Sequence, residues 1–310
     1  MTSPRTLIIA IAILLVFPRA MANTLRQGFS LPDSLEEFKM IYRTMDNLIL
    51  LPFRINDTLD VNLVLDTSCR TLVLFGNHFG KFLPTVPGKT VEFSGMGSGQ
   101  AVRGSISLGN TLRMGYIKGE DIPIVIATQK GPFKSNMRID GLIGYDIFTR
   151  FEVEVHPHRQ EIIFRAAFNR SLPEGYNYIP LRMTDQKPMI ASTITFPDEI
   201  MASDMLVDTG STLGLLLKTS DKSRFSASTA SSVLGKGLNG VFKGHTTTAH
   251  SLLLHEFEIG KIAAGITYSA RHNYASIGMG VLKNYSVIIN CVQAYMGLQP
   301  DAPVPEDVIL

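Results

Sequence analysis

A short sequence pattern occurs twice in this chain of 310 residues, and it limits the possible folds more than any other feature. Each copy consists of an apolar run, an Asp-Thr-small triplet that begins at Asp66 or Asp208, and a second apolar run. An apolar stretch and a glycine then follow further along the chain, at Gly144 after the first copy and at Gly278 after the second. Because two features recur in the same order at similar offsets, the sequence predicts a duplicated unit of about 120 residues.

The rest of the sequence is typical of a protein built from β-strands. Short runs rich in Val, Ile, Leu, Thr and Phe are separated by Gly, Pro, Asn and Asp at intervals of about 8 to 12 residues. This spacing predicts an all-β fold made largely of hairpins, with helix limited to single turns near 146–150 and 280–284. The clearest predicted strands cover residues 48–55, 61–65, 71–75, 122–127 and 152–155.

The repeat divides most of the chain into two lobes. Ser34 and Glu37 have the spacing of a capping box, so the residues around them are predicted to be helical. A stretch rich in Pro, Gly and Asn, NRSLPEGYN, predicts a linker between the two copies. The predicted parts are a signal peptide at 1–22, an N-terminal helical segment at 23–45, an N-terminal lobe at 46–168, the linker at 169–177, a C-terminal lobe at 178–300 and a tail at 301–310.

The first 22 residues have the pattern of a secretory signal peptide. Arg5 precedes the apolar run Thr6–Phe17, and the small residues Ala20 and Ala22 suit the positions before a cleavage site. The run is too short to cross a bilayer as a helix, which takes about 20 residues. An uncleaved anchor or a buried helix is the alternative interpretation. We therefore expect an exported bacterial protein, periplasmic or secreted, with no stable membrane span after cleavage.

Composition and charge exclude several other classes of protein. Hydrophobic residues make up 45% of the chain and charged residues 18%, which suits a protein with a core and not a disordered chain. The formal charge is +2, and because Arg5 and Arg19 leave with the signal peptide, the mature chain is close to neutral. Nucleic acid and anionic lipid are therefore not expected as partners. Cys69 and Cys291 are expected to be two separate buried thiols, with a disulfide between them as the alternative.

The repeated aspartates suggest a specific chemistry. An Asp at the end of an apolar strand, followed by Thr and a small residue, places a carboxylate at a tight turn. Asp66 taken alone would be interpreted as an ordinary Asx-type turn. Two copies on equivalent strands can instead face each other and share one proton as a coupled pair. The ionised member can activate a water while the protonated member polarises a carbonyl, and this is a way to hydrolyse amides without a metal or a covalent intermediate.

The chain resembles the pepsin-like and retropepsin-like aspartic peptidases, in particular compact bacterial two-lobed members. The resemblance extends from about residue 48 to 300 and depends on residues 65–68 (LDTS), 207–211 (VDTGS), 142–144 (LIG) and 276–278 (SIG). It implies an all-β, bilobal pepsin-like fold in which two homologous β-barrel-like lobes share one cleft. It also implies an aspartic endopeptidase that acts on protein or peptide substrates, works as a monomer and needs no cofactor and no metal.

The resemblance implies a role for each matching residue. Asp66 and Asp208 would be the catalytic pair, and Thr67 and Thr209 would brace the two turns by hydrogen bonds across the lobe interface. The remaining turn residues and the loops beneath them would support the carboxylates: Ser68, Cys69, Gly210 and Ser211, with Gly144 and Gly278. A flexible flap over the cleft would contain Ser94, Gly95, Met96, Gly97, Ser98 and Gly99, for which a simple mobile loop is the alternative.

Three positions depart from the family pattern. Ser68 replaces a glycine, Cys69 stands where the second copy has Ser211, and Ser94 stands where pepsin-like flaps have a tyrosine. Because a thiol donates a weaker hydrogen bond than a hydroxyl, we expect Asp66 to be the less acidic partner. The missing tyrosine makes the flap more similar to the retroviral kind.

The histidines give weaker signals. His245, His250 and His255 recur every five residues, which fits neither one face of a helix nor one side of a strand. Polar positions in a strand and a turn are therefore favoured over a metal site. His156 and His158 flank a proline in an apparent hairpin turn, where we expect both to be solvated.

Two other functions are compatible with the sequence. The first is a non-catalytic relative of the aspartic peptidases that binds an extended peptide by strand addition, which the unusual Ser68 and Cys69 would suit. The second is a purely structural β-sandwich, in which Asp66 and Asp208 would lie far apart.

Overall fold

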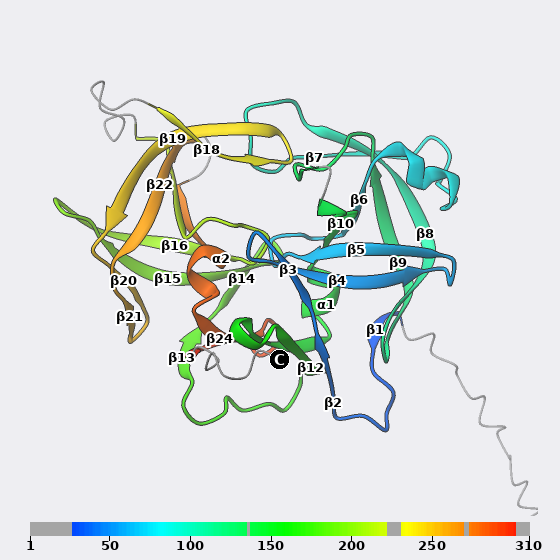
Figure 1. The fold of residues 1–310 in the computed structure, drawn as a ribbon, viewed down its shortest axis with the longest axis horizontal. Coiled ribbons are helices and arrows are strands. Elements are labelled where there is room, and N and C mark those ends of the chain that lie inside the picture. Colours follow the sequence, from blue (N-terminus) through cyan, green and yellow to red (C-terminus); the bar gives the residue numbers. More distant parts are fainter. Residues whose placement is uncertain (1–26, 135–136, 222–230, 270–272, 302–310) are drawn as a thin grey trace, which may run out of the picture.

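The computed structural model describes residues 27–134, 137–221, 231–269 and 273–301, and this part of the chain is built almost entirely of β-strands (Figure 1). It contains three sheets, two single-turn α-helices, α1 (Tyr145–Phe148) and α2 (Met279–Leu282), and short 3₁₀ turns at Asn77–Lys81 and Pro157–Arg159. The all-β prediction and both predicted helical turns are therefore confirmed. No helix in the described ranges is long and apolar enough to cross a membrane. The predicted signal peptide and residues 302–310 of the predicted tail lie outside the described residues.

The N-terminal sheet has nine strands, which come from residues 28–143 and lie on the right of Figure 1. Its apolar strands include four of the five that the sequence predicts most clearly. In order of pairing the strands are β1 (Gly28–Ser30), β9 (Ile117–Ala127), β6 (Leu72–Phe75), β10 (Gly141–Ile143), β5 (Leu59–Leu65), β4 (Leu48–Ile55), β8 (Val102–Met114) and β7 (Thr90–Phe93), with β3 (Arg43–Met45) beside β4.

The C-terminal sheet has ten strands, which come from residues 182–278 and lie on the left of Figure 1. In order of pairing they are β18 (Ser232–Gly237), β19 (Gly240–Ala249), β22 (Ile262–Tyr268), β17 (Leu215–Thr219), β23 (Tyr274–Gly278), β16 (Ile200–Asp208), β15 (Lys187–Thr195), β20 (Ser251–Leu254) and β21 (Phe257–Ile259), with β14 (Arg182–Thr184) beside β15.

The two sheets repeat the same arrangement of strands. In the N-terminal sheet β10 lies between β5, to which it is parallel, and β6, to which it is antiparallel. In the C-terminal sheet β23 lies in the same way between β16 and β17. The next strands, β9 and β22, are parallel to β6 and β17 respectively. The duplicated unit predicted from the sequence is therefore present in the strand order as well.

A third sheet joins the two halves and is called here the shared sheet. Its two central strands, β11 and β24, pair antiparallel, with Glu154 opposite Ile288. These two residues are as far apart in the sequence as the repeated glycines Gly144 and Gly278, so each half of the chain contributes the equivalent strand. One hydrophobic core cluster contains residues of all three sheets, and a second, smaller cluster lies against the N-terminal sheet. In order of pairing the strands are β13 (Asn177–Pro180), β25 (Tyr295–Pro300), β24 (Tyr285–Asn290), β11 (Phe151–His156), β12 (Glu161–Ala166) and β2 (Glu37–Ile41).

The predicted N-terminal helical segment at 23–45 is wrong, because its described residues form β1, β2 and β3. Strand β2 pairs antiparallel with β12 at the edge of the shared sheet, and Phe38 stacks on Phe164 with ring centroids 6.3 Å apart. Exposed and half-buried residues alternate along β2, which is the burial pattern of an edge strand. Backbone pairing with β12 and the aromatic contact therefore outweigh the local capping-box signal.

The shared sheet contains a buried polar network around Glu154. This carboxylate accepts hydrogen bonds from Arg165 Nη1 at 2.5 Å and Tyr176 Oη at 2.7 Å, and it lies 2.9 Å from His156 Nε2. His156 also lies 2.7 Å from Ser286 Oγ and is buried, so the expectation that it is solvated is wrong; His158 is exposed, as expected. Although burial opposes ionisation, these partners lower the pKa of Glu154 to about 2.

Replacing Glu154 by Gln tests this network. The lowered pKa means that the carboxylate stabilises the fold above its ordinary pKa of 4.5, and that this contribution disappears as the pH falls toward 2. We expect Glu154→Gln to lose about 2 to 3 kcal/mol of unfolding free energy at pH 7 and much less at pH 3, measured by urea denaturation. The exposed Glu258→Gln is the control and should change neither value. An equal loss at both pH values would contradict the expectation.

Candidate active site

The two repeated aspartates lie at the ends of equivalent strands. Asp66 directly follows β5, and Asp208 is the last residue of β16. The glycine of each downstream element packs beneath its turn: a Cβ on Gly144 would collide with the carbonyl oxygen of Asp66, and one on Gly278 with that of Leu213. Backbone hydrogen bonds complete the support, since Asp66 N donates to Ile143 O at 2.8 Å. Only glycine fits at these two positions because another main chain occupies the space of a side chain.

Thr67 and Thr209 connect the two turns by four hydrogen bonds. Thr67 N donates to Thr209 Oγ1 at 3.0 Å, and Thr209 N donates to Thr67 Oγ1 at 3.1 Å. Each hydroxyl in turn donates to a carbonyl of the opposite strand, Thr67 to Val207 O at 2.6 Å and Thr209 to Leu65 O at 2.7 Å. Both threonines are buried, so these bonds are shielded from competition by water.

The threonine bonds bring the aspartates to one place. A Cβ on Gly210 would overlap the carboxyl group of Asp66, so this carboxyl group lies against the turn that carries Asp208. Both aspartates line one cavity of about 1100 Å³, called here the cleft. This arrangement does not fit a purely structural β-sandwich with the two aspartates far apart.

The hydrogen bonds at the two carboxylates differ from those expected. Asp66 Oδ1 accepts from Ser68 N at 2.8 Å and from Ser68 Oγ at 2.7 Å, so the serine that replaces glycine is itself a donor. Cys69 Sγ instead donates to Thr71 O at 3.0 Å. In the second turn, Ser211 Oγ accepts from Leu213 N at 3.3 Å. Ser68 therefore supplies Asp66 with the hydroxyl donor that Cys69 lacks.

The proton affinities of the pair follow from these contacts. Burial raises the pKa of both carboxyl groups. The two donors of Ser68 oppose this rise at Asp66, whereas the negative charge of Asp66 adds to it and raises the pKa of Asp208 to about 7. The expectation that Asp66 is the less acidic partner is therefore wrong, because it assigned the decisive hydrogen bond to Cys69 and not to Ser68. The contacts of the pair thus favour the protonated form at Asp208 and the ionised form at Asp66.

The predicted flap is the turn between β7 and β8, and its first residues line the same cavity as the two aspartates. Ser94, Gly95, Met96, Gly97 and Ser98 line the cleft, while Gly99 lines a neighbouring surface depression. Gly97 has a φ of 128°, a backbone conformation that glycine tolerates best. The turn is thus in the position expected of a flap.

A second hairpin, made by β18 and β19, meets the flap over the cleft, and sequence reasoning missed it. Asn239 at its tip donates from its backbone N to Met96 O at 2.9 Å and accepts from Gly99 N at 2.7 Å. Its side chain accepts from Gly95 N and donates to Gln100 O. The signal was present in the repeat, since Gly237 follows Gly95 at the same offset that separates the two aspartates.

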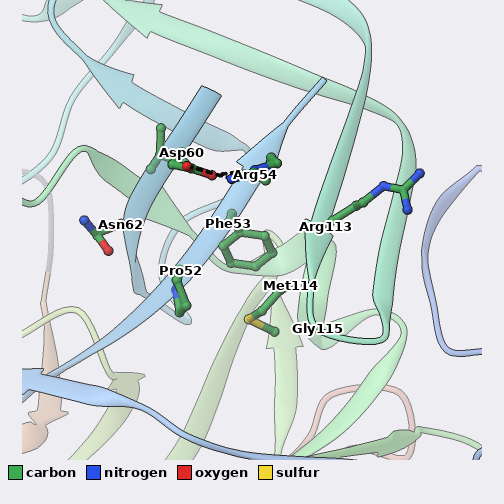
Figure 2. A pocket seen from close by; sticks show the side chains of 9 residues that line it. Pro52, Phe53, Arg54, Asp60, Asn62, Arg113, Met114 and Gly115 are labelled. Carbon is green, nitrogen blue, oxygen red and sulfur yellow. Dashed lines mark hydrogen bonds and ion pairs between the residues drawn. The ribbon is translucent and has the colours of Figure 1, made fainter. Parts of the chain in front are cut away.

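The other candidate positions do not form a site. A smaller cavity of about 230 Å³ between β4, β5 and the end of β8 is shown in Figure 2; Arg54 pairs there with Asp60 at 2.7 Å, and neither repeated aspartate reaches it. His245 lies on β19, while His250 and His255 lie in the turns that flank β20. Among the described residues, no group of three His, Cys, Asp or Glu side chains gathers as a metal site. Cys69 and Cys291 are separate buried thiols, as expected.

Comparison with known proteins does not identify a relative: no family model matches the chain, and no curated protein is significantly similar to it in sequence.

The assignment of the proton to Asp208 can be tested by titration. Carbon-13 NMR of the side-chain carboxyl groups should show Asp208 titrating near pH 7 in the native protein. In Asp66→Asn its pKa should fall, because the neighbouring negative charge is gone, but burial should keep it above the ordinary value. The exposed Asp60→Asn serves as the control and should leave Asp208 unchanged. An unchanged pKa of Asp208 in Asp66→Asn would show that the two carboxylates are not coupled.

The contact between the two hairpins can be tested at Asn239. Asn239→Ala removes the acceptor of the Gly95 amide and the donor to Gln100, so the flap should open more often. We expect hydrogen exchange of the Gly95 amide, followed by NMR, to accelerate by about tenfold, with little change in global stability. Asn77→Ala, at an exposed position on a 3₁₀ turn, should have no effect on Gly95. Unchanged exchange in Asn239→Ala would mean that the side chain does not hold the hairpins together.

Proposed function

We propose that this protein is an aspartic endopeptidase with a bilobal, pepsin-like arrangement of two β-lobes around one cleft. The observation that carries the proposal is the set of hydrogen bonds between Thr67 and Thr209, which holds the buried Asp66 and the half-buried Asp208 from equivalent strands at one cleft. The repeated strand order of the N-terminal and C-terminal sheets supports the two-lobed arrangement. The paired hairpins are more similar to the retropepsin-like members than to a single pepsin-like flap.

The unequal proton affinities of the pair assign each aspartate a task. Asp66, ionised, accepts a proton from a water molecule, whose oxygen attacks the carbonyl carbon of the peptide bond. Asp208, protonated, donates its proton to the carbonyl oxygen, so that a neutral tetrahedral intermediate forms. When the carbon–nitrogen bond breaks, Asp66 returns its proton to the leaving amine, and a hydroxyl of the intermediate returns a proton to Asp208. The cycle ends with both carboxyl groups in their starting states.

The cleft suits a substrate in an extended conformation. The two hairpins at the cleft contain β7 and β18. Each of these strands is the edge strand of its sheet, and no other described strand pairs with its outer side. An extended peptide can hydrogen-bond to such edges by strand addition. The contacts between Asn239 and the flap must break before a peptide enters, so the hairpins act as a gate.

A second candidate function is peptide binding without hydrolysis, in the same cleft. It is favoured by the hydrogen bonds that hold the two hairpins together and by the two donors of Ser68, which hold the Asp66 carboxylate in its ionised form. The proposal for hydrolysis differs from it only in what the aspartates do to the bound peptide.

The signal-like N-terminus supports export, and we propose a periplasmic or secreted protein that works as a monomer on protein or peptide substrates. The proposed chemistry needs no cofactor, because two carboxyl groups and a water complete it.

Cleavage of an unfolded protein by the purified chain tests the proposal. We expect cleavage at acidic to neutral pH, inhibition by pepstatin, and a loss of at least about a thousandfold in kcat/KM for both Asp66→Asn and Asp208→Asn, because either change removes the shared proton chemistry. Asp60→Asn, an exposed aspartate of the smaller cavity, is the matched control and should keep full activity.

Two results would count against the proposal. Cleavage that survives Asp208→Asn would remove the aspartates from the mechanism. Binding of peptides in the cleft with no cleavage between about pH 3 and 8 would instead favour the non-catalytic function.

A further inference from the structure

The two halves of the cleft differ in chemistry. Both sides carry apolar side chains, but the three lysines of the cleft and its two tyrosines all come from the C-terminal sheet, whereas the charged residues of the N-terminal side, apart from Asp66, are Arg70 and Glu92. The apolar lining of the N-terminal side includes Val73, Val91, Phe93, Val125 and Leu142, and the opposite lining includes Lys187, Lys218, Lys243, Tyr268 and Tyr274. A duplicated scaffold thus carries two unlike surfaces on either side of the aspartates.

Lys218 is the most informative of the basic residues. It lies on β17 opposite Tyr274 of β23, and only 8% of it is exposed. Its ammonium group donates to Tyr274 Oη at 2.9 Å and lies 4.5 Å from the centre of the same ring. Lys218 lines the same cavity as the two aspartates, and its positive charge lowers the pKa of Asp208. Lys218 is therefore a buried cation at the wall of the cleft that also contains the two aspartates.

The acids of the cleft other than the pair already have basic partners. Glu92 pairs with Arg103 at 2.8 Å, and Asp185 pairs with Arg70. In contrast, Lys187, Lys218 and Lys243 form no ion pair within 4.0 Å with a carboxylate of the described residues. Lys187 and Lys218 act on Asp208 only by attraction over a longer distance. The cleft therefore retains positive charge that its own acids do not neutralise.

A buried lysine at this position is costly for the fold. Removing an ammonium group from water without a carboxylate partner is unfavourable, and an apolar side chain would avoid the cost. The N-terminal sheet has an apolar side chain at the equivalent position. The registers of the two sheets show that Phe75 corresponds to Lys218. An incoming carboxylate would supply the missing partner, in a site where water screens the pair weakly.

We propose that Lys218 is a specificity-determining residue that binds an acidic side chain of the substrate, adjacent to the scissile bond on the C-terminal side of the cleft. This inference rests on the proposed peptidase function and names its substrate class: peptides in which an apolar residue and a glutamate or aspartate flank the cleaved bond. The apolar residue lies against the N-terminal sheet, and the acid forms an ion pair with the ammonium group of Lys218, beside Tyr274.

Matched peptides test the proposal. A set with Phe on one side of the central bond and Glu, Gln or Lys on the other, in both orders, is assayed at about pH 6, where Glu is ionised. The native protein should cleave one Glu peptide with a kcat/KM at least about tenfold above its Gln counterpart. Lys218→Met should bring this Glu/Gln ratio close to one, and Lys218→Arg should restore part of it. Because Lys218 also acts on Asp208, the ratio is the readout, since an effect on the aspartates alone changes both peptides equally.

Control variants separate this role from a structural one. Lys283→Met removes an exposed lysine outside the cleft and should leave the ratio unchanged. If Lys218→Met does not fold, as judged by its circular dichroism and thermal unfolding, Lys218→Gln replaces it. Two results overturn the proposal. The first is a Glu/Gln ratio near one for the native protein in both peptide orders, and the second is a ratio that remains unchanged in a folded Lys218→Met or Lys218→Gln variant.

Failure of the peptidase function would be distinguishable from failure of the specificity inference. If the native protein cleaves no peptide, binding of the Glu and Gln peptides is measured by calorimetry. Tighter binding of Glu that is lost in Lys218→Met supports recognition of an acid by Lys218 in a non-catalytic cleft. Equal binding of the two peptides, or no binding, overturns it.

Discussion

The hydrogen bonds between Thr67 and Thr209 are the contact on which the rest of this structure depends. Each threonine joins its own turn to the backbone of the opposite strand, so neither turn is complete without the other half of the chain. They place the Asp66 carboxyl group against Gly210, at a distance where a side chain on that glycine would not fit. The closeness of two carboxylates, which is unfavourable by itself, is thus imposed by a buried neutral network and relieved by one shared proton.

The scaffold is symmetric, whereas its chemistry is not. The strand order repeats between the N-terminal and C-terminal sheets, and the shared sheet joins them at the pairing of β11 with β24. At equivalent positions of the repeat, however, the residues differ. Ser68 of the first copy corresponds to Gly210 of the second, and Phe75 corresponds to Lys218. The first difference gives Asp66 a hydroxyl donor, and the second places a lysine at the wall of the cleft on the C-terminal side only. A duplicated fold supplies two similar positions, and single side chains then give them different chemical surroundings.

Much of this architecture could be predicted from the sequence, and the failures have identifiable causes. The strand at 48–55 and the two helical turns were predictable because their signals are local and agree with their surroundings. No helix forms around Ser34, which lies in a turn, and β2 begins at Glu37 because pairing with β12 outweighs a capping signal. His156 was expected in solvent, yet its partner Ser286 is remote in sequence. The β18–β19 hairpin was missed although the repeat places Gly237 in register with Gly95, because its contact with the flap appears only in the folded structure.

The sequence by itself determined the all-β class, the duplication and which two aspartates are repeated. These features are visible in the sequence because the alternation of apolar runs and turns, and a motif that occurs twice, are local patterns. Tertiary structure alone decided how the proton affinities of the two aspartates differ. That outcome depends on which donor reaches which oxygen, and Ser68, not Cys69, reaches Asp66. It also decided that Lys218 lies at the wall of the cleft, because burial and the distance to Tyr274 arise only when the strands pack together. Electrostatic effects depend on distances and on burial, and a sequence specifies neither directly.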